Sequence, residues 1–270
     1  MITWFSNAPE PIVKKYKFFQ IVQIIVIALF LILLILSNLV FFIPLKYLEA
    51  KFNINRYSHF FIRLVSKLSL RLLRIEYKSY GTPMKENGCV VSNHISWLDI
   101  FSLSSTQNIV FVSKSDLKTW FGIGALAKIV GVLFINRDKS KIIANNQSFK
   151  DRLLSGEKLL FFPEGTSSDG LQVLPFKSTL FQAVIDADRA LQNLYVQSVT
   201  IRYRAPNNED ERFFGWWGDI SFKDHLFLIL SNNKGGKIDL FFHKPHKVSG
   251  FKDRKEMSAF LEKEVASAFL

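Results

Sequence analysis

The sequence contains only one cysteine, Cys89, among 270 residues. A single thiol excludes an intrachain disulfide and any zinc site built from several cysteines, so nothing calls for an oxidising compartment. Acidic residues are also scarce, because 23 Asp and Glu stand against 35 Lys and Arg, for a formal net charge of +12. This charge favours a partner with a negative surface, either an anionic membrane or a nucleic acid.

Several catalytic and recognition motifs are missing as well. The chain has neither a G-x-S-x-G nucleophile elbow nor a P-loop, so a covalent serine mechanism has no support. It also has no basic-aromatic strand motif, zinc finger or recognisable helix-turn-helix. We therefore expect no nucleic-acid partner.

Three short patterns resemble binding motifs without the required context. Gly122-Ile123-Gly124 does not directly follow a strand, as a dinucleotide-binding loop would. Asp186 and Asp188 fall within a predicted helix, and the two histidines of the run 243–246 are separated by a proline and lack an evident third ligand. The sequence therefore predicts no metal site.

A long apolar run lies near the N-terminus. Residues 18–45 carry no charge, and this run is longer than the roughly 20 residues that a spanning helix needs. It is also too long for a signal peptide, and no cleavage site follows it. Because basic residues flank both ends, the positive-inside rule does not fix the orientation. We expect the segment either to span the bilayer or to bend near Ser37-Asn38 or Pro44 and return to the same leaflet.

Basic and apolar side chains then recur at helical spacing between Tyr57 and Ile75. The pattern predicts an amphipathic helix that either packs on the core or lies at an anionic membrane surface. Its cations are Arg63, Lys67, Arg71 and Arg74.

After the turn signals at residues 80–83, short apolar runs alternate with longer amphipathic ones. This alternation predicts an α/β domain. The predicted strands are residues 89–92, 109–112, 132–135, 159–162, 194–203 and 237–242. The predicted helices are residues 97–104, 117–130, 141–154, 177–191, 222–230 and 252–269.

A histidine and an acid follow the first predicted strand of this domain. If Asp99 accepts a hydrogen bond from one ring nitrogen of His94, the other nitrogen is free to remove a proton from a hydroxyl. Asp99 can instead cap the next helix together with Ser96. Alone, the spacing favours a buried histidine beside an ordinary helix cap, and only the rest of the chain favours the general base.

Two other strands also end in polar residues. Gly165 permits close backbone approach to a ligand, and Glu164 can hold a substrate hydroxyl or a neighbouring cation. Arg137 can clamp a phosphate, although a surface arginine is the alternative. Together, the three strand ends indicate one site.

In order and spacing, these residues resemble the glycerolipid acyltransferase family that includes 1-acylglycerol-3-phosphate acyltransferases. The resemblance covers roughly residues 80–205. The matching blocks are Asn93-His94-x4-Asp99, residues 134–137, 162–167 and 196–201, with Lys114 and residues 174–177 also fitting.

The resemblance implies a mixed central sheet flanked by helices, and the apolar run adds an N-terminal membrane-embedded helical segment. Residues 1–50 would form the membrane attachment, 51–78 the basic amphipathic helix and 79–270 the catalytic domain. The protein would lie at the inner (plasma) membrane with this domain facing the cytoplasm.

The resemblance also implies the reaction. An acyl group would pass from an acyl-CoA or acyl carrier protein thioester to a lysolipid hydroxyl, without a metal or other cofactor and without an acyl-enzyme. His94 would deprotonate the hydroxyl and Asp99 would orient His94. The expected substrate-binding residues are Asn93, Lys114, Arg137, Glu164, Gly165 and Thr166.

Two departures from the family pattern concern the acceptor. Ser167 stands where members that use a phosphate acceptor usually have arginine, and Gln197-Ser198 replaces a proline, which should change a turn more than a charge. The sequence of residues 166–170, together with residues 216–219 and His225, resembles the branch that contains lyso-ornithine lipid acyltransferases. We expect 1-acylglycerol-3-phosphate as the acceptor, with lyso-ornithine lipid as the alternative and a non-catalytic lipid-binding protein as a remote third.

Overall fold

The computed structural model describes residues 4–6, 15–52, 54, 57–136 and 141–269, and it has a mixed α/β fold. The strands are β1 (Ile75–Tyr80), β2 (Gly88–Ser92), β3 (Val110–Lys114), β4 (Leu133–Ile135), β5 (Leu159–Phe161), β6 (Tyr195–Arg204), β7 (Gly236–Phe242) and β8 (His246–Lys247). The α-helices are α1 (Phe18–Phe52), α2 (Ser58–Leu72), α3 (Leu98–Thr106), α4 (Ile123–Ile129), α5 (Ile142–Leu154), α6 (Thr179–Leu191), α7 (Phe222–Leu230) and α8 (Arg254–Ser267).

The strands form one mixed sheet in the order β1-β7-β6-β2-β5-β3-β4, with β8 paired to β6. Around β2 the neighbours β5 and β6 both run parallel to it, whereas β7 runs antiparallel to β6. All five residues of β2 are buried, as expected for a strand covered on both faces. The predicted central sheet flanked by helices is therefore confirmed.

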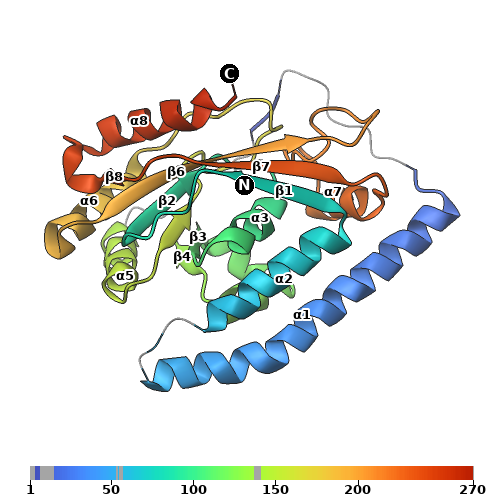
Figure 1. Ribbon diagram of the computed structural model, residues 1–270, viewed down its shortest axis with the longest axis horizontal. Coiled ribbons are helices and arrows are strands. Elements are labelled where there is room, and N and C mark those ends of the chain that lie inside the picture. Colours follow the sequence, from blue (N-terminus) through green and yellow to red (C-terminus); the bar gives the residue numbers. More distant parts are fainter. Residues whose placement is uncertain (1–3, 7–14, 53, 55–56, 137–140, 270) are drawn as a thin grey trace.

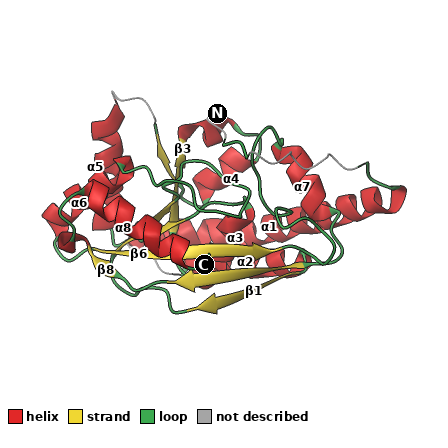
Figure 2. Cartoon of the chain, turned by 90° about the horizontal axis from the view of Figure 1, so that it is seen from above, coloured by secondary structure: helices red, strands yellow, loops and turns green. Residues whose placement is uncertain are grey.

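Helices cover both faces of this sheet (Figures 1 and 2), with α8 on one side and α2 and α3 on the other. Side chains alternate between the two layers along β2. Val90 packs into a core with Leu98 and Leu103 of α3, whereas Cys89 packs into a second core with Val184 of α6. Two apolar layers thus hold β2 at the centre of the fold.

Two predicted helices differ from the observed ones. The amphipathic helix predicted between Tyr57 and Ile75 ends at Leu72; Arg74 adopts a φ of 58°, and the chain then enters β1, which pairs with β7. The predicted helix 117–130 is divided between a 3-10 turn (Ser115–Thr119) and α4, with Gly122 at a φ of 71° between them. In both places a left-handed residue interrupts the helix, and after Arg74 the pairing of β1 with β7 also overrides the local periodicity.

The apolar N-terminal run forms α1, a single helix that continues through Pro44 to Phe52. The chain therefore does not turn back near Ser37-Asn38 or Pro44; α2 runs back beside α1 only after Phe52 (Figure 1). At about 1.5 Å per residue, such a helix is about 52 Å long. The range 51–78 thus contains the end of α1, all of α2 and most of β1.

Polar side chains fasten α1 to the domain. The Asn38 amide donates to the carbonyl of Phe61 in α2 at 3.3 Å, and the Gln23 amide donates to the carbonyl of Leu230 in α7 at 3.0 Å. The buried Glu49 carboxylate accepts the backbone N–H of Ser58 at 2.9 Å. A carboxylate at this place satisfies the free N–H groups that begin α2 and complements its dipole.

The other side of α1 is exposed and apolar. Its most apolar 18-residue window has a mean hydropathy of 3.2 and is only 6% buried, so by length and composition α1 can cross a membrane. An exposed stripe follows the helix at spacings of three and four residues. It consists of Ile25, Leu29, Leu33, Leu36 and Val40.

The start of β2 generates a stability prediction. Gly88 has a φ of 141°, and a Cβ there would lie 1.8 Å from the carbonyl oxygen of Tyr195. Gly88→Ala should therefore lower the free energy of unfolding by about 2 kcal/mol or more. Gly156→Ala is the matched control, because its φ is 76° but no atom lies within 4 Å of the added Cβ. Equal thermal unfolding midpoints for the two variants in detergent would contradict the prediction.

Candidate active site

The predicted site residues follow the carboxyl ends of neighbouring parallel strands. In the sheet, β2, β5 and β3 are adjacent and parallel. His94 follows the end of β2, Glu164 follows β5, and Lys114 is the last residue of β3. In open α/β sheets ligands bind at this edge, so strand order explains why residues far apart in sequence converge.

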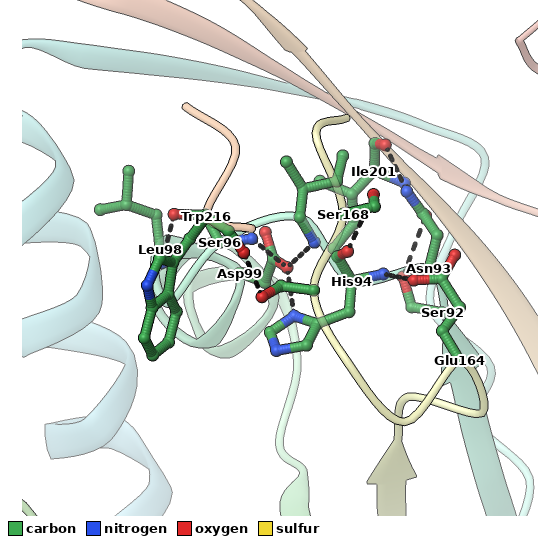
Figure 3. A network of polar contacts seen from close by, with 12 residues as sticks. Ser92, Asn93, His94, Ser96, Leu98, Asp99, Glu164, Ser168, Ile201 and Trp216 are labelled. Atoms are coloured by element: carbon green, nitrogen blue, oxygen red, sulfur yellow. Dashed lines mark hydrogen bonds and ion pairs between the residues drawn. The ribbon is translucent and has the colours of Figure 1, made fainter. Parts of the chain in front are cut away.

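The predicted catalytic pair, His94 and Asp99, occupies the turn between β2 and α3. His94 Nδ1 lies 2.7 Å from Asp99 Oδ2, and Figure 3 shows the other ring nitrogen pointing away from the acid. Because a carboxylate only accepts hydrogen bonds, Nδ1 carries the proton and Nε2 is the free acceptor. The imidazole is 20% exposed and stacks on Phe162, with ring centroids 4.1 Å apart. This is the tautomer that a general base needs.

Asp99 performs both roles that the sequence left open. Its Oδ2 accepts the backbone N–H groups of Ile95 at 2.8 Å and Ser96 at 3.0 Å in addition to the His94 ring. Its Oδ1 accepts the hydroxyl of Tyr203 at 2.7 Å. In a fully buried carboxylate, four donors replace the lost hydration and fix the group in one orientation.

Asn93 is buried in the sheet and contacts the backbone of β6. Its side-chain amide donates to the Ile201 carbonyl at 2.9 Å and accepts the Ile201 N–H at 2.8 Å. Both ends of the amide are therefore engaged, which differs from the predicted contact with substrate. The side chain instead joins the end of β2 to β6 and positions the turn that follows.

Glu164 also bonds to the protein itself. One carboxylate oxygen accepts the backbone N–H of His94 at 2.9 Å and the other accepts that of Leu174 at 2.8 Å. The side chain is 2% exposed, and burial raises the pKa of Glu164 to about 8, against the opposing effect of these two hydrogen bonds. Glu164 thus clamps the His94 turn to the segment after the third block, rather than presenting a carboxylate to substrate.

The remaining predicted binding residues surround the turn after β5. The Lys114 ammonium donates to the Gly165 carbonyl. Gly165 has a φ of 71°, and a Cβ there would lie 2.9 Å from Lys177 Nζ, so only glycine fits without displacing that ammonium. The Thr166 hydroxyl donates to the Ser167 carbonyl at 3.3 Å. Arg137, the last predicted residue, lies outside the described residues.

Two further residues bind the His94 turn from the other side, and the motifs did not indicate either contact. Ser168 donates its backbone N–H to the His94 carbonyl at 2.9 Å, and Trp216 donates its own to the Ile95 carbonyl at 2.9 Å. The hydroxyl of Ser167 donates to the Trp216 carbonyl. The segment around Trp216 therefore packs where the third block lacks its usual arginine.

The fourth block lies within β6 and not in a turn, so the expected effect of its missing proline was wrong. The Gln197 amide donates to the carbonyls of Thr82 at 2.9 Å and His243 at 2.7 Å and accepts the Met84 N–H at 2.8 Å.

Of the two histidines in the run 243–246, His246 is paired with Glu264 at 3.0 Å. Among the described residues, no group of three or more histidine, cysteine or acidic side chains is arranged to hold a metal ion.

Comparison with known proteins identifies similar sequences. The chain is 45% identical over 206 residues to the lyso-ornithine lipid O-acyltransferase of Rhodobacter capsulatus, covering 76% of this chain and 74% of that protein. It is 33% identical over 237 residues to the protein of the same name from Brucella abortus, covering 83% and 86%. It is 39% identical over 127 residues to the 1-acyl-sn-glycerol-3-phosphate acyltransferase of Neisseria gonorrhoeae, covering 46% and 48%.

The fold also has a solved counterpart. The crystal structure of the 1-acyl-sn-glycerophosphate (LPA) acyltransferase PlsC from Thermotoga maritima matches it with a TM-score of 0.63 at 17% identity, covering 93% of this chain and 96% of that one. Residues 74–202 match the family described as Acyltransferase. That range contains the His94 turn, the Glu164 clamp and their supporting strands, and with the extensive sequence relatives it shows that this chain belongs to the acyltransferase family.

Proposed function

We propose that this protein transfers a fatty acyl group from a thioester to the free hydroxyl of a lysolipid, and that the acceptor is lyso-ornithine lipid. The observation that carries the chemistry is the His94–Asp99 pair, at 2.7 Å, with Nε2 directed away from the acid. The acceptor is supported by the relatives with the more extensive alignments, which are named lyso-ornithine lipid O-acyltransferases. The sequence motifs alone favoured 1-acylglycerol-3-phosphate (lysophosphatidate) as the acceptor.

The reaction follows from the free ring nitrogen. Nε2 of His94 removes the proton from the lysolipid hydroxyl as the oxygen attacks the thioester carbonyl carbon. The tetrahedral intermediate then collapses, the carbon–sulfur bond breaks, and the proton on Nε2 passes to the departing thiolate. Asp99 stabilises the imidazolium between the two proton transfers. No acyl-enzyme and no metal are needed, and the donor is an acyl-CoA or an acyl carrier protein thioester.

The charges around the third block support the choice of acceptor. Lysophosphatidate presents a dianionic phosphomonoester, whereas an ornithine headgroup presents one carboxylate and one ammonium. Position 167 offers no cation, since it is a serine whose hydroxyl donates to the Trp216 carbonyl. Loss of one charge-assisted contact to a phosphate costs roughly 1.5 to 3 kcal/mol. A zwitterionic headgroup depends less on that contact.

The acceptor is tested by comparing kcat/KM for lyso-ornithine lipid and lysophosphatidate. We expect a preference for lyso-ornithine lipid of about tenfold or more, which is about 1.4 kcal/mol in transition-state binding. His94→Ala should lower turnover of either acceptor by roughly 10²- to 10⁴-fold. His246→Gln, on the far side of β6 next to α8, is the control and should retain activity. A preference for lysophosphatidate would reject the acceptor, and His94-independent transfer would reject the mechanism.

The Glu164 clamp predicts a pH dependence of stability. Its folded-state pKa of about 8 lies above the ordinary value of 4.5, so between these pH values the folded state binds more protons than the unfolded state. Stability should therefore fall as pH rises through this window. Unfolding midpoints measured from about pH 5 to about pH 9 should decline more steeply in the wild type than in Glu164→Gln, which cannot titrate. Parallel declines would show that Glu164 has an ordinary pKa.

We further propose that the exposed stripe of α1 embeds in the inner membrane, with the catalytic domain in the cytoplasm beside its thioester donors. The stripe lies opposite the groups that fasten α1 to α2 and α7, so both surfaces of the helix can be occupied together. The positive net charge of +12 complements an anionic membrane surface.

Substitutions in the exposed stripe of α1 test the membrane attachment. The wild type should remain with membranes in high salt and in alkaline carbonate, because its attachment is hydrophobic. Leu29→Lys combined with Leu33→Lys should release it, since each lysine costs about 3 kcal/mol in the membrane interior. Phe18→Lys is the control: Phe18 is also exposed but is the first residue of α1, where the ammonium can reach water. Retention of the double variant after carbonate extraction would contradict the proposal.

A further inference from the structure

Tyr203 is the one side chain outside the catalytic turn that donates to the Asp99 carboxylate among the described residues. It lies in β6, and its hydroxyl is 2.7 Å from Asp99 Oδ1, the oxygen that the His94 ring does not use. The phenol ring packs against Phe214, with ring centroids 5.2 Å apart. Its position is therefore set by the sheet and the core, independently of the turn that carries His94.

We propose that Tyr203 is a positioning residue for acyl transfer, whose hydroxyl fixes the Asp99 carboxylate and lowers the basicity of His94 through it. The proposal rests on the acyl-transfer function proposed above. Burial raises the pKa of Tyr203, and the nearby Asp99 charge raises it further, so the phenol stays protonated and remains a donor. A donor to one carboxylate oxygen withdraws charge from the other, which weakens the pull of Asp99 on the imidazole proton.

The geometry explains why the turn alone is not sufficient. The Ile95 and Ser96 N–H groups bind the same oxygen as His94, so they leave Oδ1 without a donor from the turn. Without Tyr203, the carboxylate would carry more charge on a buried oxygen and could rotate toward other donors. Removing the hydroxyl should therefore change both the orientation of His94 and its proton affinity.

Other titratable groups near Asp99 must be kept constant in the test. Glu164, behind the His94 backbone, has a pKa raised to about 8 by burial, and it feels the Asp99 charge. His225, on α7, has a pKa lowered to about 4 by burial, so it is neutral near pH 7. Tyr203→Phe removes only an oxygen atom and leaves both groups in place. A difference between the pH profiles of the wild type and of Tyr203→Phe is then due to the hydroxyl.

The experiment measures kcat/KM for acyl transfer to a lysolipid across pH, in the full-length protein. Tyr203→Phe should lower kcat/KM about three- to tenfold on the acidic side. Because His94 becomes harder to deprotonate, its acidic limb should move to higher pH by roughly 0.5 to 1 unit, and the loss should shrink at alkaline pH. Tyr195→Phe, a half-buried tyrosine at the other end of β6, is the matched control and should leave the limb unchanged.

A second variant retains the hydrogen bond in case Tyr203→Phe does not fold. 3-Fluorotyrosine at position 203 is a stronger donor, so it should move the acidic limb in the opposite direction, to lower pH. The proposal would be overturned if the acidic limb of the kcat/KM profile did not move in whichever of the two variants folds. A loss of activity that is uniform at every pH counts as such a result. Failure of the proposed function is distinct, because the wild type and Tyr195→Phe would then show no His94-dependent transfer.

Discussion

The Asp99 carboxylate is the group on which the geometry of the site depends. A charge with no exposed surface is tolerated only where hydrogen bonds replace its hydration, and Asp99 receives four of them. Two come from the backbone of the turn, one from the catalytic imidazole and one from β6. Local backbone, reactive group and sheet are therefore joined through one side chain. It also lies in the first turn of α3, where the helix dipole favours negative charge.

The clamps around this carboxylate share a physical pattern. Asn93 bonds to the backbone of Ile201, and Glu164 bonds to the backbone of His94 and Leu174. The Ile201 groups are fixed by β6, whereas His94 and Leu174 lie in loops that Glu164 joins to each other. Polar residues beside the histidine can therefore serve to hold its turn without touching a substrate. Under the proposed function, acceptor recognition would then fall to other predicted binding residues, among them Lys114 and the turn at Gly165.

Much of the sheet and the contact between His94 and Asp99 could be predicted from the sequence. Strands such as β2 and β7 are short apolar runs bounded by turn residues, and His94 with Asp99 is a local spacing. The roles of Asn93 and Glu164 could not be predicted, since their partners are main-chain groups from segments far along the chain. Tyr203 could not be predicted for a related reason: it lies between Arg202 and Arg204 in β6, far along the chain from Asp99, and only the strand order places β6 beside β2. Helix ends were missed where left-handed residues such as Arg74 stop a periodic pattern.

The placement of Cys89 has a separate consequence. This thiol is fully buried at the centre of the sheet, five residues before His94, and burial raises its pKa. Thiol reagents attack the thiolate, so modification requires both that the sheet open and that the sulfur meet water. With no other cysteine in the chain, the rate of that reaction depends only on how often the sheet opens around Cys89. The protein thus carries a built-in chemical reporter of how often the strand beneath its catalytic turn comes apart.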